Sequence, residues 1–342
     1  MSLTSLLKNK DVQERFRQEF IKPQFLIKKD MLAPPLSNRY SLVGTAFDYL
    51  LRFYLQRLNS NAVEKKHWVA EFAVDRLADS PGLHKKAQTI IVQAKKNVAN
   101  YLKSGQVKNE LIRSALLLGG LDPIIRAGVG HENIGLVFED DIQDLRKLIT
   151  VVEPHLFSAP KLCLLNPTFG EASSLVGGAD ADLVIDDTII DIKTTKNLRC
   201  LSRDFHQLIG YYVLHQIGAV GEIRPKLKIK KVAIYFSRFA YLHSFEIQEI
   251  IEPSTFPKFI KWFETRARKE NKDITNRVLK VRRDRVDRSS PPAYTKWTNK
   301  KGESLIRNNK GGDYFIVGPG GATSGICQIS KAKAISWLKT NT

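Results

Sequence analysis

The sequence predicts an α/β protein, long enough for one large domain or two moderate ones. Three observations predict this class. Apolar residues recur at helical spacing from Ser41 to residue 157. After "NPTFGE" the period changes to that of strands, and strand and helix patterns then alternate to about residue 269. The order therefore places a block of helices before a core of mixed strands and helices.

The helical block begins with "SLVGTAFDYLLRFYLQRL" at Ser41, whose apolar residues share one face of an amphipathic helix. Its buried face is predicted to contain Val43, Phe47, Leu50, Leu51, Tyr54 and Leu58. Further helices are predicted at 63–80, 84–104, 108–128 and 140–157. We expect "GGLDP" (Gly119 to Pro123) to split its segment, because glycine and proline interrupt helices.

The strand pattern occupies the second half of the chain. Strands are predicted at Ala172–Gly177, Ala179–Ile185, Thr188–Ile192, Lys230–Phe236 and Ala240–Ile247. A helix is predicted within this series at Arg203–Gln216, and another follows from Thr255 to Lys269. Three of the predicted strands come before the helix at Arg203–Gln216 and two come after it. This order is typical of a sheet that is covered by helices.

Both ends of the chain differ from this core. Near the start, "MLAPPLSNRY" predicts an extended segment, because consecutive prolines cannot continue a helix. After residue 272 the chain is basic, poor in apolar periodicity and interrupted by Pro291–Pro292, which is typical of a linker or mobile arm. Such an arm is either a solvated tail or a contact to nucleic acid. A small element closes the chain, with "YFIVGPGGATSG" and then the helical "SKAKAISWLK".

The composition favours a polyanionic partner. Lys and Arg number 54 against 35 Asp and Glu, giving a formal charge of +19, so we expect a nucleic acid as the partner, with solubility alone as the alternative. Three cysteines, Cys163, Cys200 and Cys327, lie far apart without zinc or disulfide spacing. The N-terminus has no signal-peptide pattern and no stretch reaches the ~18 apolar residues of a membrane span. These features predict a soluble cytoplasmic protein without a membrane partner.

The stretch "VGGADADLVIDDTIIDIKTTK" combines strand patterns with carboxylates. If Asp186–Asp187 form a two-residue turn, Asp182 lies opposite Asp191 and Asp180 lies opposite Lys193. These four side chains then share one face, because side chains alternate along a strand. The other face takes Ala181, Leu183, Ile190 and Ile192.

Like charges held opposite each other destabilise a sheet, so a counter-charge is required. A Mg²⁺ ion would supply it, since Mg²⁺ is commonly held by one or two carboxylates, water and phosphate oxygens. A solvated acidic face with Lys193 as its ion-pair partner is the alternative. A slip of the turn by one residue would change the pairing.

These residues resemble the signature of the PD-(D/E)XK nuclease superfamily. In that signature one strand carries a carboxylate, and the next strand carries a second carboxylate, any one residue and then a lysine. "QLIGYYVL" places Gln207 and Tyr211 as in the Q-x-x-x-Y motif of the RecB-like branch. "GTAFDYLL" places Gly44 and Asp48 as in the G-x-x-x-H/D/E motif of that branch.

The resemblance implies a mixed sheet flanked by helices in the order α-β-β-β-α-β. The nuclease core would span 41–59 and 166–272, with 60–165 as a large helical insertion. Outside the core would lie an N-terminal segment, 1–40, and a basic linker with a small C-terminal element, 273–342.

The resemblance also implies the chemistry. Asp182, Asp191 and the carbonyl of Ile192 would bind Mg²⁺, for which Mn²⁺ commonly substitutes. Lys193 would orient or activate the attacking water and offset charge on the phosphate. Asp48, where histidine is common, would be a third ligand.

Two competing ligands are Glu171, expected on the first strand, and Asp180, which would replace Asp182 if the turn were longer. No iron–sulfur cluster is expected, because that group needs four cysteines.

Basic residues follow the lysine of the motif. Lys196, Arg199 and Arg203 are expected to contact the phosphate backbone of DNA, with solvated charges as the alternative. The sequence thus predicts a metal-dependent DNA nuclease. A non-catalytic nucleic-acid-binding protein and a ribonuclease of the same fold are its rivals.

Overall fold

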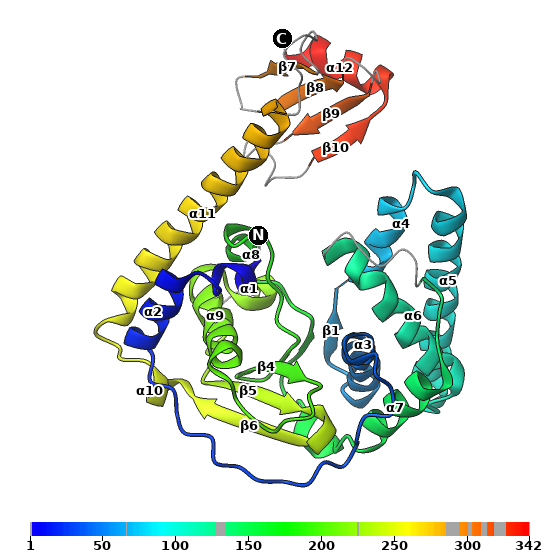
Figure 1. Ribbon diagram of the computed structural model, residues 1–342, viewed down its shortest axis with the longest axis vertical. Coiled ribbons are helices and arrows are strands. Elements are labelled where there is room, and N and C mark those ends of the chain that lie inside the picture. The colour runs from blue at the N-terminus through cyan, green and yellow to red at the C-terminus, as the bar shows by residue number, and fades with distance from the viewer. Residues whose placement is uncertain are drawn as a thin grey trace. The chain divides into compact units, whose positions relative to one another are not determined.

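The chain forms two compact units (Figure 1). The larger contains Leu7–Ser173 and Ala179–Ile260, and the smaller contains Met1–Leu6, Ser174–Gly178 and Lys261–Thr342. The structure is a computed structural model. It describes residues 2–65, 67–126, 134–223, 226–284, 294–299, 303–308, 313–317 and 326–341.

Within the described part of the larger unit, six strands form one mixed sheet. They are β1 (Ala62–Glu64), β2 (Cys163–Leu165), β3 (Leu183–Ile185), β4 (Thr188–Lys193), β5 (Lys231–Phe236) and β6 (Tyr241–Glu246), in that spatial order. The pairs β1–β2 and β4–β5 are parallel, and the other three pairs are antiparallel. The protein is therefore an α/β protein with a mixed sheet.

Two helices cover opposite faces of this sheet, α3 (Tyr40–Leu58) and α9 (Ser202–Gly218). The ring of Phe205 in α9 lies 5.9 Å from that of Phe245 in β6, which pairs with Val232 of β5. The ring of Phe47 in α3 stacks on Tyr235, three residues further along β5. Because an odd step along a strand reverses the side-chain direction, α3 and α9 lie on opposite faces. The expectation of a sheet flanked by helices is confirmed.

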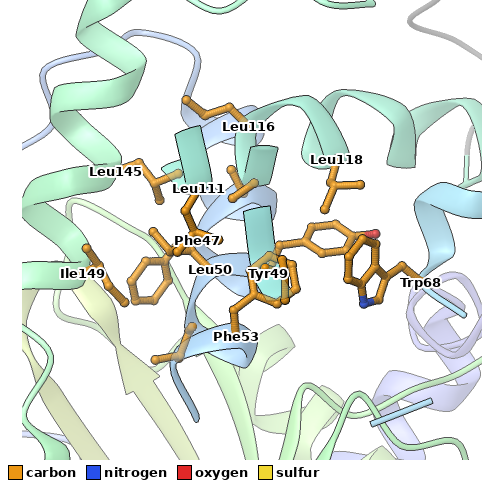
Figure 2. Close-up of a cluster of buried hydrophobic side chains, with 14 of the residues drawn as sticks. Phe47, Tyr49, Leu50, Phe53, Trp68, Leu111, Leu116, Leu118, Leu145 and Ile149 are labelled. Atoms are coloured by element: carbon orange, nitrogen blue, oxygen red, sulfur yellow. The ribbon is translucent and has the colours of Figure 1, made fainter. Parts of the chain in front are cut away.

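Residues between β1 and β2 form a helical layer on α3. It contains η1 (Val69–Glu71), α4 (Phe72–Arg76), α5 (Pro81–Ser104), α6 (Asn109–Arg126), α7 (Glu139–Thr150) and η3 (Pro154–Phe157). Figure 2 shows Phe47, Leu50 and Phe53 of α3 among Leu111 of α6 and Leu145 of α7. Because α3 packs on both the sheet and this layer, the two share one hydrophobic core.

Two details of the helical block differ from the sequence prediction. The segment 63–80 is not one helix, since β1, η1 and α4 share it. The helix α6 continues through "GGLDP", which was expected to split it. A Cβ added at Gly119 would lie 3.0 Å from the backbone nitrogen of Ala46, so this glycine allows α3 and α6 to approach closely.

The start of the strand series also differs. The segment Ala172–Gly177, predicted as a strand, overlaps the short helix α8 (Glu171–Leu175). Ser173 Oγ accepts a hydrogen bond from the Phe169 N–H at 2.8 Å, which fixes the first turn of this helix. On the side of β3 away from β4, the neighbouring strand is β2. The prediction missed β2 because three buried apolar residues show no alternation.

The extended segment predicted before α3 is confirmed from Met31 to Arg39, where no regular element occurs. Two helices precede it that were not predicted, α1 (Leu3–Leu6) and α2 (Lys10–Glu19). The helices α10 (Ile247–Ile250) and α11 (Phe256–Asp284) follow the sheet, and α11 extends well past its predicted end. Among the described residues, none of the helices combines the length and apolar character of a membrane span.

The smaller unit contains a folded element where a linker was predicted. Its strands are β7 (Tyr294–Thr298), β8 (Ser304–Asn308), β9 (Tyr314–Val317) and β10 (Ile326–Ile329), which form an antiparallel sheet in the order β10-β9-β8-β7. The predicted closing helix is confirmed as α12 (Lys331–Asn341). Leu305, Tyr314 and Ala334 are buried together and join this helix to the sheet. Pro291–Pro292 lie outside the described residues.

Candidate active site

The hairpin of β3 and β4 has the predicted register. Leu183 pairs with Ile190 and Ile185 pairs with Thr188, so Asp186–Asp187 are the two turn residues. Asp186 adopts a positive φ of 50°, and its Oδ1 accepts hydrogen bonds from two backbone N–H groups of 161–162. A register slip is therefore excluded, and the same register continued by one residue brings Asp182 opposite Asp191.

Asp182 and Asp191 project toward the α9 face of the sheet. Asp191 is 1% exposed and pairs with Ile234, which lies on that face. Asp182 Oδ2 accepts a hydrogen bond from the N–H of Ile192 at 2.6 Å. Burial and the charge of Asp191 raise the pKa of Asp182 well above its ordinary value. Burial also raises the pKa of Asp191. A solvated acidic face is thus excluded for Asp191.

Lys193 supplies the local counter-charge. Its Nζ lies 2.7 Å from Asp191 Oδ2 and donates a hydrogen bond to Oε1 of Gln207 at 3.0 Å. Burial alone would lower the pKa of Lys193, but the carboxylate of Asp191 outweighs burial and raises it. Lys193 is therefore an ammonium ion at neutral pH, and the ion pair that was expected in the alternative to a metal site is present.

The Q-x-x-x-Y residues continue this chain of contacts. Gln207 Nε2 donates to the hydroxyl of Tyr211 at 2.7 Å, so its amide oxygen faces Lys193. Phe169 stacks on the Tyr211 ring at 5.7 Å. Burial, followed by the charge of Asp191, raises the pKa of Tyr211 well above its ordinary value. The two motif residues thus orient Lys193 from α9, four residues apart on one helix face.

The G-x-x-x-D motif reaches the same place from α3. The charge of Asp48 contributes to the raised pKa of both Asp182 and Asp191, so Asp48 acts on this pair of carboxylates. A Cβ added at Gly44 would lie 3.7 Å from Cβ of Thr194, directly after β4. The small residue therefore marks where α3 crosses the end of β4.

The other candidate ligands lie less favourably. Glu171 is exposed at the start of α8, so its expected place on the first strand is wrong. Asp180 is half-buried, forms a bridge with Thr168 and lies 4.0 Å from Lys65. Ile192 contacts the site through its N–H, which donates to Asp182.

The three predicted phosphate contacts lie on the segment between β4 and α9. Lys196, Arg199 and Arg203 are all exposed. Lys196 Nζ donates to the hydroxyl of Tyr40 at 2.6 Å, at the start of α3. The segment is thus a cationic edge beside Lys193, although no described contact shows what it binds.

Two site residues were missed by sequence reasoning. Arg52 Nη2 lies 2.7 Å from Asp48 Oδ2, and Glu64 of β1 lies 3.5 Å from the same guanidinium. The i, i+4 spacing of Asp48 and Arg52 within an otherwise apolar stretch was the available signal for the first. Nothing local to the sequence indicates Glu64.

The carboxylates meet one requirement of a hard cation site. In the part of the chain that the structure describes, the buried Asp48 Oδ1 accepts no hydrogen bond, and Asp191 Oδ2 has the Lys193 ammonium as its partner. Such oxygens are costly without a partner and are the ligands that Mg²⁺ prefers. However, the described residues include no group of three or more His, Cys, Asp and Glu arranged to hold a metal as they stand. The donor set fits Mg²⁺ once the Lys193 ammonium moves from Asp191.

No protein-family model, curated protein or solved structure matches the chain. The resemblance to a nuclease family therefore depends on the motifs and on the way the fold assembles them. Five motif residues lie together at β4, at α9 and directly before β3. They are Asp182, Asp191, Lys193, Gln207 and Tyr211. Asp48 of α3 acts on the two aspartates through its charge.

Proposed function

We propose that this protein is a Mg²⁺-dependent deoxyribonuclease of the RecB-like branch of the PD-(D/E)XK superfamily. The observation that carries the proposal is the arrangement of Asp182, Asp191 and Lys193. A buried and a half-buried carboxylate, both with raised pKa values, adjoin one ammonium on a hairpin, which is a costly arrangement for a structural role alone. Perturbed groups of this kind cluster at catalytic sites.

Asp182, Asp191 and Asp48 would hold Mg²⁺ through carboxylate oxygens. The chemistry that Mg²⁺ supplies when bound is positive charge at the phosphate and a lower pKa of water. The carboxylates carry the negative charge that a divalent cation needs. Asp48 Oδ1 accepts no hydrogen bond from the described residues, and Asp191 Oδ2 would exchange the Lys193 ammonium for the metal. The raised pKa values of Asp182 and Asp191 mean that metal binding displaces protons.

Lys193 would act as a cation and hydrogen-bond donor. Because its pKa is raised, it cannot accept a proton from water at neutral pH. Its Nζ can instead hold a water or a phosphate oxygen and offset the negative charge that develops during hydrolysis. Gln207 keeps this ammonium in place when it leaves Asp191, since its Oε1 already accepts a hydrogen bond from Nζ. Tyr211 fixes the orientation of that amide.

The substrate proposed is DNA. A charge of +19 favours a phosphate polymer, and Lys196, Arg199 and Arg203 place exposed cations beside the site. Charge alone does not separate DNA from RNA. A ribonuclease of the same fold and a non-catalytic binding protein are the alternatives that an assay separates.

The direct test is cleavage by the purified full-length protein. Linear, circular and single-stranded DNA and RNA are incubated with Mg²⁺, with Mn²⁺ or with EDTA, and the products are separated on gels. We expect DNA cleavage with either metal and none with EDTA. Cleavage of RNA alone would favour the ribonuclease, and retention of DNA without cleavage would favour the binding protein.

The cationic edge gives a separate prediction about affinity. Replacing Lys196, Arg199 and Arg203 together with Gln should lower the slope of log affinity against log salt by up to about 3, because each duplex phosphate contact contributes roughly 0.9. The measurement is fluorescence anisotropy of labelled DNA over a salt series. Exchanging Lys85, Lys96 and Lys103 of α5 for Gln changes the net charge equally and is the control. Equal slopes in the two triple variants would show that the edge is merely solvated.

A further inference from the structure

Asp48 is held by an arginine that the family motif does not contain. Arg52 is one turn further along α3, and its side chain is only 3% exposed. Its Nη2 lies 2.7 Å from Asp48 Oδ2, and its Nε donates to the backbone carbonyl of Asp48 at 3.3 Å. A guanidinium so deeply buried needs several fixed partners.

The remaining partners of Arg52 belong to the segment 60–165 or are fixed by it. Glu64 of β1 lies 3.5 Å from Nη1, and the side chain of Trp68 interacts with the same carboxylate. The guanidinium lies over the ring of Tyr49 at 4.4 Å. Figure 2 shows Tyr49 and Trp68 next to each other, with their rings 6.4 Å apart.

Tyr49 is itself fixed by the same segment. Its hydroxyl donates to Asp122 at 2.6 Å and accepts from the N–H of Ala70 at 3.1 Å. The ring that supports the guanidinium therefore cannot turn without breaking two buried hydrogen bonds. Arg52 is thus clamped between Asp48 on one side and insertion residues on the other.

This clamp determines which oxygen of Asp48 is free. Oδ2 is engaged by Arg52, whereas the buried Oδ1 accepts no hydrogen bond from the described residues. The positive charge of Arg52 also offsets a third carboxylate beside Asp182 and Asp191, whose mutual repulsion would otherwise displace it. Partners of a ligand side chain commonly change metal affinity 10- to 100-fold.

We propose that Arg52 is a positioning residue that presents Oδ1 of Asp48 to the cation, and that the segment 60–165 contributes to the site by fixing Arg52 through Glu64 of β1. This inference rests on the proposed function, since it concerns the same metal. It assigns a role to the segment 60–165, which lies outside the nuclease motifs.

The test measures Mn²⁺ binding by electron paramagnetic resonance without DNA, together with the DNA KM and the Mg²⁺ concentration that gives half-maximal cleavage. The variants are Arg52→Met, Arg52→Lys and Glu64→Gln. Arg57→Met is the matched control, because Arg57 is on the same helix and also reaches the insertion, through the Leu102 carbonyl at 2.6 Å.

We expect Arg52→Met to weaken Mn²⁺ binding about 10- to 100-fold and to raise the half-maximal Mg²⁺ concentration, with the DNA KM unchanged. Arg52→Lys should recover part of the affinity, and Glu64→Gln should give a smaller loss. A purely structural role would lower the melting temperature and leave Mn²⁺ affinity unchanged in the folded variants, which would overturn the inference.

The same data separate this inference from the proposed function. Wild-type protein that binds no Mn²⁺ would overturn both. In another outcome, wild type binds Mn²⁺, Asp191→Asn does not, and Arg52→Lys and Glu64→Gln bind it as tightly as wild type. That outcome would support the proposed metal site but would show that Arg52 does not contribute to it. If Arg52→Met does not fold, these two conservative variants decide the question.

Discussion

Replacing Lys193 with alanine is expected to abolish DNA cleavage while DNA binding remains close to wild type. The lost ammonium is the one that adjoins Asp191 and Gln207, so the variant lacks the cation that would offset charge on the phosphate. We expect a loss of about 10²- to 10³-fold in the single-turnover rate, the range for one electrostatic contact in an active site. Affinity should change little, because one of 54 basic residues is removed.

The control for this experiment is Lys196→Ala, which removes an exposed cation three residues away. Its cleavage rate at saturating DNA should stay near that of wild type. Melting temperatures are measured with Mg²⁺, because Lys193→Ala leaves the buried Asp191 without its ion-pair partner. If Lys193→Ala folds and cleaves DNA at a rate within about tenfold of the wild-type rate, the role given to this residue would be contradicted.

The central part of the site could be predicted because its determinants are local. A two-residue turn at Asp186–Asp187 fixes the register of its hairpin, so the opposition of Asp182 and Asp191 follows from the alternation of side chains. Gln207 and Tyr211 are four residues apart on a helix, so their contact follows from helix geometry. In each case one short stretch contains all the information.

The contacts that were missed connect distant parts of the chain. Glu64 meets Arg52 because β1 pairs with β2, about a hundred residues later, and each of these strands has only three residues. Such short strands show no period. The sheet of the smaller unit was missed for a related reason, since its strands of four or five residues are separated by basic and glycine-rich stretches. Tertiary pairing, rather than local preference, decides these elements.

Replacing Asp182 with asparagine is expected to raise the melting temperature in the absence of divalent metal. Asp182 has no ion-pair partner among the described contacts, and its pKa is raised well above the ordinary value by burial and then by Asp191. The amide oxygen of asparagine can still accept the hydrogen bond from the Ile192 N–H. We expect a rise of at least about 2 °C, which corresponds to about 1 kcal/mol in a chain of this size.

The matched variant is Asp191→Asn, which neutralises the other carboxylate of the pair. Asp191 is paired with Lys193 at 2.7 Å, so its loss leaves a buried ammonium without that partner. Asp191→Asn should therefore melt at or below the wild-type temperature in EDTA. Identical melting temperatures for both variants and wild type would mean that the two carboxylates do not repel each other.

The sign of the pH dependence follows from the raised pKa. The folded protein binds a proton at Asp182 more tightly than the unfolded chain does, so this residue favours folding at low pH. That contribution is lost as the pH rises from the ordinary carboxyl pKa through the raised value. The difference in melting temperature between Asp182→Asn and wild type in EDTA should thus widen from acidic toward neutral pH. A constant difference across that range would contradict the repulsion.

Mg²⁺ should reverse the order of stability. A ligand that binds only the folded state stabilises it by about 3 kcal/mol at a hundred times its dissociation constant. Wild type should gain this stabilisation from Mg²⁺ at neutral pH and progressively less of it at acidic pH, because the carboxylates must be ionised to bind metal. Asp182→Asn and Asp191→Asn should each gain little. Without metal Asp182→Asn should have the higher melting temperature, but wild type should gain more from Mg²⁺. The two melting temperatures, plotted against Mg²⁺ concentration, are therefore expected to cross. Equal gains in melting temperature for wild type and both variants would show that neither residue belongs to the metal site.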